Sequence, residues 1–208
     1  MANRCLADRT NAWTDTDHTC YTVYTAGSSG FLNILPIYLD HIFHPLLREQ
    51  DFLTEVHHIN EDGDDAGVVY SEMQGVENKP SNMIYFDLIR QIYPGNSSYT
   101  VQTGGALRNL REDTTIEKVR AYHKKFYRPE NLYLTITGNV DPSQLFAALD
   151  PVEKKVEARK DEYPPFEKPF MVNIPYFKQS GFDKLSKRAF VLLSVVDKLC
   201  SCAFVLNF

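Results

Sequence analysis

Residues 31–47 read FLNILPIYLDHIFHPLL, and the predicted fold is built around them. Its apolar residues recur every three or four positions, so they share one broad face of a helix. They are Phe31, Leu35, Tyr38, Leu39, Ile42, Phe43 and Leu46. A face of this width needs a core to cover it. The sequence therefore predicts a core helix, capped by Ser28 or Ser29, with Pro36 in its first turn or at a kink.

Two regions predict the sheet that this helix covers. Leu132, Leu134 and Ile136 alternate with residues of the opposite face, which is the period of a strand with one buried side. Residues 10–25 are rich in threonine, tyrosine and valine, and a polar turn at residues 15–17 divides them. The expected fold class is α+β, with a mostly antiparallel sheet and helices packed on one face.

Further helices are predicted from their start and stop signals. They are expected at residues 48–54, 66–76, 82–93, 114–128 and 141–150. Thr114 and Glu117 have the spacing of a capping box, and Pro129 ends the helix that they begin. Asp141 and Pro142 supply a cap and a first-turn proline for the last helix.

Three regions of different composition follow one another along the chain. Residues 1–150 hold the predicted helices and strands, and residues 151–176 form a charged, proline-containing linker. Residues 177–208 are an atypical apolar tail, almost long enough at its end to cross a bilayer. Asp197 and Lys198 would make such a crossing costly, so we expect no membrane partner.

Composition excludes some classes of function. The 208 residues carry a net charge of -5 with no basic stripe, which argues against nucleic-acid binding. Cysteines at positions 5, 20, 200 and 202 have neither zinc-knuckle nor disulfide-framework spacing. We expect free thiols in a reducing compartment, and the first four residues give no secretory signal.

The histidines offer one local alternative for a metal site. The residues concerned are His41 and His44 on the core helix, and His57 and His58 near Glu55. We favour the simpler interpretation that His41 and His44 lie on the polar side of the helix.

Several stretches, taken in order, resemble one known protease family. They are residues 10–14 (TNAWT), 18–21, 31–47, 67–75 (GVVYSEMQG), 104–105 and 126–139. Together they resemble the pitrilysin/insulinase family of zinc metallopeptidases, the inverzincins, in its presequence-protease-like branch. No resemblance is visible beyond about residue 176. The resemblance implies an incomplete metallopeptidase half-domain.

This resemblance implies a role for Glu72 as the carboxylate ligand of zinc. A catalytic zinc needs three protein ligands, and the family supplies two histidines and a general base from a His-x-x-Glu-His motif. That motif does not occur in these 208 residues. We therefore expect an N-terminally truncated fragment of a zinc-dependent metalloendopeptidase, inactive alone and without stably bound zinc. The family often has a second acidic residue before this ligand. Asp65 lies seven residues before Glu72, and whether it corresponds to that residue stays open.

The resemblance also implies a substrate and partners. The backbone of Asn11, Ala12, Trp13 and Thr14 would bind an extended peptide by strand addition. Trp13 could stack on substrate or equally pack against the core. A second homologous half-domain would close over the peptide, in the cytoplasm or the mitochondrion.

Two other interpretations remain open at this point. The chain could be a non-catalytic family member or partner subunit that binds peptides or another chain without metal. It could also be a compromised truncation product.

Overall fold

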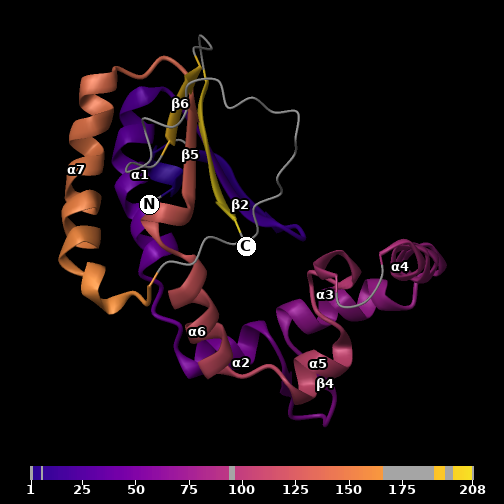
Figure 1. The fold of residues 1–208 in the computed structure, drawn as a ribbon. Coiled ribbons are helices and arrows are strands. Elements are labelled where there is room, and N and C mark those ends of the chain that lie inside the picture. The colour runs from indigo at the N-terminus through magenta and orange to yellow at the C-terminus, as the bar shows by residue number, and fades with distance from the viewer. Residues whose placement is uncertain (1, 6, 94–96, 166–189, 195–198, 208) are drawn as a thin grey trace. The chain divides into compact units, whose positions relative to one another are not determined.

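The computed structural model of the chain describes residues 2–5, 7–93, 97–165, 190–194 and 199–207 (Figure 1). The chain divides into two compact units. We call residues 1–13, 17–45 and 122–208 the sheet unit, and residues 14–16 and 46–121 the insert unit. Each unit is described by itself.

The sheet unit contains a five-stranded sheet in the order β1-β2-β7-β5-β6. The strands are β1 (Ala7–Thr14), β2 (His18–Ala26), β5 (Leu132–Thr137), β6 (Phe190–Ser194) and β7 (Leu199–Asn207). β7 runs antiparallel to both β2 and β5, whereas β6 runs parallel to β5. The predicted α+β class with a mostly antiparallel sheet is therefore confirmed.

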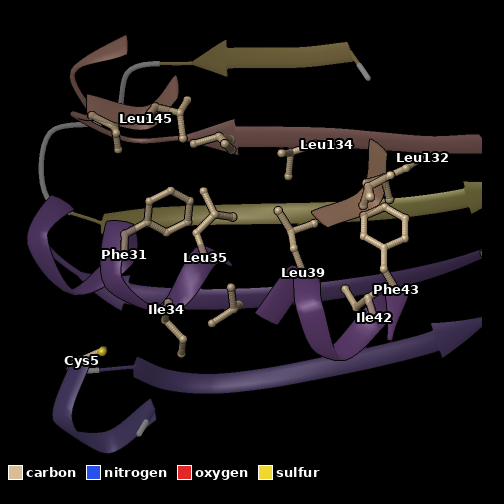
Figure 2. Packing of buried hydrophobic residues seen from close by; sticks show 14 residues of the cluster. Cys5, Phe31, Ile34, Leu35, Leu39, Ile42, Phe43, Leu132, Leu134 and Leu145 are labelled. Atoms are coloured by element: carbon tan, nitrogen blue, oxygen red, sulfur yellow. The ribbon is translucent and has the colours of Figure 1, made fainter. Parts of the chain in front are cut away.

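Helices α1 (Ser28–Phe43) and α7 (Pro142–Ala158) pack side by side on one face of this sheet (Figure 1). Three short 3₁₀ helices complete the described part of the unit: Ala2–Cys5, Pro129–Asn131 and Lys160–Glu162. Figure 2 shows the core between helices and sheet. Its buried residues are Cys5, Val23, Phe31, Ile34, Leu35, Leu39, Ile42, Phe43, Leu132, Leu134, Ile136, Val140, Leu145 and Val156.

This core follows the predicted patterns. Leu132, Leu134 and Ile136 are buried while Tyr133 between them is exposed, as the alternation required. Five of the seven apolar residues predicted for the core helix are buried, and Tyr38 packs at their edge. Leu46 differs, because α1 ends at Phe43 and leaves this side chain 77% exposed.

The start of α1 differs from the prediction. Gly27, with a φ of 84°, occupies the position before the helix, and neither Ser28 nor Ser29 supplies a side-chain cap. Pro36 lies well inside the helix and not in its first turn. The apolar face on both sides of the proline is buried in the core, which favours continuation of the helix across it.

The end of α7 also differs from the prediction. The helix was expected to stop near residue 150, but it continues through Pro151 to Ala158. Val152 and Val156 extend the apolar face begun by Leu145 and pack against the same core. This burial outweighs the hydrogen bond that a proline removes. The first residues of the predicted linker 151–176 are therefore helical, and its part from residue 166 lies outside the described residues.

Part of the predicted tail is strand. β6 and β7 both fall within residues 177–208, and β7 lies between β2 and β5 in the sheet. The rest of that tail, with Asp197 and Lys198, lies outside the described residues. Among the helices that the structure describes, none is both long and apolar enough to cross a bilayer.

The insert unit is mainly helical. Its elements are α2 (Glu49–Glu55), β3 (His58–Ile59), β4 (Asp65–Ala66), α3 (Val68–Glu77), α4 (Pro80–Ile92), a 3₁₀ turn at Ser98–Thr100 and α5 (Leu107–Glu112). Tyr70, Met73 and Leu110 form its small buried core. α5 was not predicted, because six residues are too few to show a helical period.

Helix α6 (Ile116–Phe126) leads from the insert unit to the sheet unit. Its cap is one residue later than predicted, because the amide of Lys118 donates to the Thr115 hydroxyl at 3.3 Å. The Thr114 hydroxyl instead donates to the carbonyl of Asn109, near the end of α5. At the other end of α6, the Asn131 side chain donates to the Phe126 carbonyl at 3.0 Å.

Neighbouring positions on α7 test this account of the core. Leu145 is fully buried, whereas Phe146 is 58% exposed. We expect Leu145→Ala to lower the free energy of unfolding by about 2–5 kcal/mol, because it leaves a cavity. Phe146→Ala, the matched control, should change it by less than about 0.5 kcal/mol. Urea denaturation measures both, and equal losses would contradict the assigned face of α7.

Candidate functional site

Glu72 lies on the exposed side of α3. The opposite side of this helix is anchored, because Tyr70 and Met73 are buried against Leu110. Val68, which is 59% exposed, precedes Glu72 by four positions and lies on the same side. The helix therefore presents one carboxylate outward from a rigidly packed base.

Two glycines allow α3 to pack closely. Gly67 begins the helix with a φ of 133°, and a Cβ there would lie 2.7 Å from the Val56 carbonyl oxygen. A Cβ on Gly104 would collide with the sulfur of Met73. Both glycines belong to stretches that carried the family resemblance. Their physical role is close approach of backbone to α3.

A polar network ties α3 to its neighbours. The His57 Nε2 lies 2.7 Å from Asp65 Oδ1, and the Tyr70 hydroxyl donates to Asp65 Oδ2 at 3.0 Å. Arg111 on α5 donates to the Tyr70 hydroxyl at 2.8 Å and lies 3.5 Å from Asp65 Oδ2. The network thus connects the β3–β4 hairpin, the first turn of α3 and α5.

The charge of Asp65 is stabilised by this network. The hydrogen bond with His57 is the largest cause that lowers the pKa of the Asp65 carboxyl. The Tyr70 hydrogen bond and the Arg111 charge act in the same direction, while burial opposes them. The Tyr70 hydrogen bond also raises the pKa of Arg111. Asp65 is therefore an ionised acceptor, although nothing in the geometry makes it a metal ligand.

The predicted peptide-binding residues lie in β1, at one edge of the sheet. Asn11, Ala12, Trp13 and Thr14 are all exposed, and Trp13 is 46% exposed. The Ala12 amide donates to the side-chain oxygen of Asn11 at 3.0 Å, and the Asn11 carbonyl accepts a long hydrogen bond of 3.4 Å from Thr22. The edge position is what strand addition requires. The binding role itself stays a prediction.

Glu72 and β1 belong to different units. Glu72 lies in the insert unit, and Asn11 to Trp13 lie in the sheet unit. The structure brings Asp65 together with His57, Tyr70 and Arg111. Among the residues that it describes, Glu72 belongs to no group of three possible metal ligands.

The residues present do not fit a complete zinc site. Within the described part of the chain, no group of three histidine, cysteine, aspartate or glutamate side chains could hold a metal ion. The alternative histidine site does not form there either. His44 pairs with Asp40, His57 pairs with Asp65, His58 bonds the Leu53 carbonyl, and His41 is exposed.

The sequence patterns did not predict the contact between Tyr70 and Arg111. Arg111 is separated from Tyr70 by 41 positions and from Asp65 by 46. An arginine on a short helix carries no local signal of such a contact. Tyr70 was part of the quoted stretch, but only its burial shows its role.

Comparison with known proteins places this arrangement in a family. A family profile described as Peptidase M16 inactive domain matches residues 113–204. An uncharacterized protein of Caenorhabditis elegans is 49% identical over 180 residues, 86% of this chain and 18% of its own length. The mitochondrial presequence protease of Xenopus tropicalis is 32% identical over 148 residues, 67% of this chain and 14% of its own length. The chain belongs to the pitrilysin/insulinase family of peptidases.

These matches cover only a small part of each relative. A fission yeast relative, an uncharacterized protein of Schizosaccharomyces pombe, is 40% identical over 165 residues, 79% of this chain and 16% of its own length. This pitrilysin-family chain thus spans less than a fifth of the length of these relatives. The family profile reaches residue 204, beyond the region in which sequence analysis saw the resemblance. The family is generally zinc-dependent.

Two glycines on α3 provide a matched test of how the helix is held. We expect Gly67→Ala to lower the free energy of unfolding by about 1–3 kcal/mol or more, because of its positive φ and the Val56 carbonyl. Gly75→Ala should raise it by about 0.5–1 kcal/mol, since a Cβ there meets no atom within 4 Å. Thermal denaturation checks both. A neutral Gly67→Ala would refute the close packing.

The Asp65 network predicts acid sensitivity. Because the folded-state pKa is lowered, Asp65 stabilises the fold above its unfolded value, which is about 3.9 for aspartate. That stabilisation should be lost as the pH falls through the folded-state pKa. We expect Asp65→Asn to reduce the pH dependence of stability below about pH 4. Asp87→Asn, at an exposed surface pair, is the control. An unchanged acid profile in Asp65→Asn would contradict the network.

Proposed function

We propose that this chain forms part of a zinc-dependent metalloendopeptidase that cleaves extended peptides. It would contribute the Glu72 carboxylate and the β1 edge, and it would hydrolyse no peptide by itself. The observation that carries the proposal is the outward position of Glu72 on a helix that is anchored on its other side. The likeness to presequence proteases supports it.

The number of zinc ligands in this chain supports the proposal that the chain alone hydrolyses no peptide. One carboxylate does not hold zinc at useful affinity, and a catalytic site needs three protein ligands. The two histidines and the general base of the family motif are not among these 208 residues. We propose that they come from polypeptide outside them.

The contacts that hold α3 in place support the proposal that the neighbouring residues position Glu72. A ligand must be held in a fixed direction before the metal arrives, because a mobile carboxylate pays its ordering entropy on binding. Gly67 sets the start of the helix, and the bonds among Asp65, Tyr70 and Arg111 fix its first turn. Glu72 follows directly after that turn.

The β1 edge supports peptide binding through backbone contacts. Strand addition recognises an extended chain more than a particular sequence. Trp13 adds an exposed aromatic surface beside that edge.

The exposed helix α4 supports the proposal of a protein partner. We propose that this partner is a second homologous half-domain. No residue of α4 is buried. Its exposed large apolar residues are Met83, Ile84, Tyr85, Leu88 and Ile92. A helix of this length normally depends on burial of an apolar face. The much greater length of the relatives is consistent with further polypeptide on this face.

The compartment we propose is the cytoplasm or the mitochondrion. Mitochondrial names are carried by presequence proteases of Xenopus tropicalis and Candida albicans, at 32% and 30% identity. The more similar relatives carry no compartment in their names.

A second candidate function is peptide or protein binding without metal. It is favoured by the description of the matching profile as an inactive domain. In that case β1 and α4 would keep their roles, and Glu72 would have none.

The deciding experiment uses Trp13, the single tryptophan, as a reporter. We expect an unstructured peptide to shift Trp13 fluorescence, and Ala12→Pro to weaken binding because it removes a backbone N–H from the edge. Ala12→Gly keeps that N–H and serves as the control. Absence of binding to the wild type would refute the peptide-binding edge.

Zinc distinguishes the two candidate functions in the same preparation. The chain should be purified from its cells together with its bound polypeptide, and zinc measured by elemental analysis. Zinc in that complex, lost in Glu72→Gln, together with peptide hydrolysis, supports the peptidase. A zinc-free complex that still binds peptide supports the second function. Hydrolysis by the isolated chain would contradict the proposed inactivity.

A further inference from the structure

The open side of β1 carries a hydrogen bond that the chain makes with itself. Among the strands that the structure describes, β1 pairs only with β2, at the end of the sheet order. The short link at residues 15–17 makes these two strands an antiparallel hairpin. In such a hairpin, successive residues of β1 turn their backbone N–H and C=O groups alternately toward β2 and toward the open side.

The contacts of Asn11 show which residues of β1 face the open side. The Asn11 carbonyl accepts a hydrogen bond from the Thr22 hydroxyl of β2 at 3.4 Å, so the backbone of Asn11 is directed toward β2. The next residue, Ala12, therefore directs its N–H and its C=O to the open side. These are the two groups to which an added strand would bind at this position.

The Asn11 side chain already accepts one of these two hydrogen bonds. Its Oδ1 lies 3.0 Å from the Ala12 backbone nitrogen and accepts the hydrogen bond of that N–H. The carboxamide thus takes the bond that the backbone carbonyl of an added strand would otherwise accept, since both groups are amide C=O acceptors. Asn11 is exposed, so rotation about its side-chain bonds can release the Ala12 N–H without disturbing the core.

We propose that Asn11 caps the β1 edge in the free chain, and that an extended peptide must displace its carboxamide to bind. The inference rests on the proposed peptide-binding function of β1. The cap does not cover the Ala12 C=O, so a peptide N–H can bind there first and the peptide carbonyl then replaces Asn11. An edge strand that pairs freely with other chains is a hazard, and a self-made cap lowers that hazard.

Amide hydrogen exchange of the full chain without peptide, measured by NMR, tests the cap. We expect the Ala12 N–H to exchange about two- to tenfold faster in Asn11→Ala, after correction for the intrinsic rate of each sequence. Asn11→Asp keeps an acceptor oxygen at the same position, so it should retain the protection. The amide of Val23, a buried residue of β2, should keep its wild-type rate. An unchanged Ala12 rate in Asn11→Ala, or an equal increase at Val23, would overturn the cap.

Peptide binding to the same variants tests the displacement. A capped, uncharged peptide of alternating threonine and serine is titrated against Trp13 fluorescence. We expect it to bind Asn11→Ala about two- to tenfold more tightly than the wild type, and Asn11→Asp no more tightly. Equal or weaker binding to Asn11→Ala would overturn the displacement. If neither the wild type nor any variant binds the peptide, the proposed function fails, and the Ala12 exchange rate alone decides whether Asn11 caps the edge.

Discussion

Burial of the apolar face of α1 against the sheet organises the core of the sheet unit. Phe31, Leu35 and Leu39 are almost completely buried between α7 and the strands. Each such side chain contributes about 1.5–3 kcal/mol when it leaves water. This packing holds α1 against the sheet along the length of the helix.

The insert unit depends on a different kind of contact. Its buried core is small, and the polar network around Asp65 joins three of its elements. Hydrogen bonds to a charged group are stronger than neutral ones, so a few of them can replace apolar area. Glu72 is therefore presented by a helix whose geometry is held by both kinds of contact.

Family membership rests on sequence similarity, whereas a catalytic function needs residues that meet in space. The profile covers residues 113–204, and the presequence protease of Xenopus tropicalis aligns with 67% of the chain. A zinc site, in contrast, needs ligands that converge in space, and the described residues offer no such group. The proposed function therefore depends on three exposed features that other polypeptides could contact: the Glu72 carboxylate, the β1 edge and the apolar helix α4.

Local patterns in the sequence were enough to predict the elements with a regular period and the order in which they occur. The α1 face, the alternation at 132–136 and the helix of Glu72 could all be predicted, because each is encoded within a few neighbouring residues. The long-range contacts, in contrast, could be seen only in the folded chain. In the folded chain, α7 continues past Pro151, β7 lies between β2 and β5, and Arg111 donates a hydrogen bond to Tyr70. Such outcomes depend on burial and pairing between distant segments, and no local pattern in the chain records them.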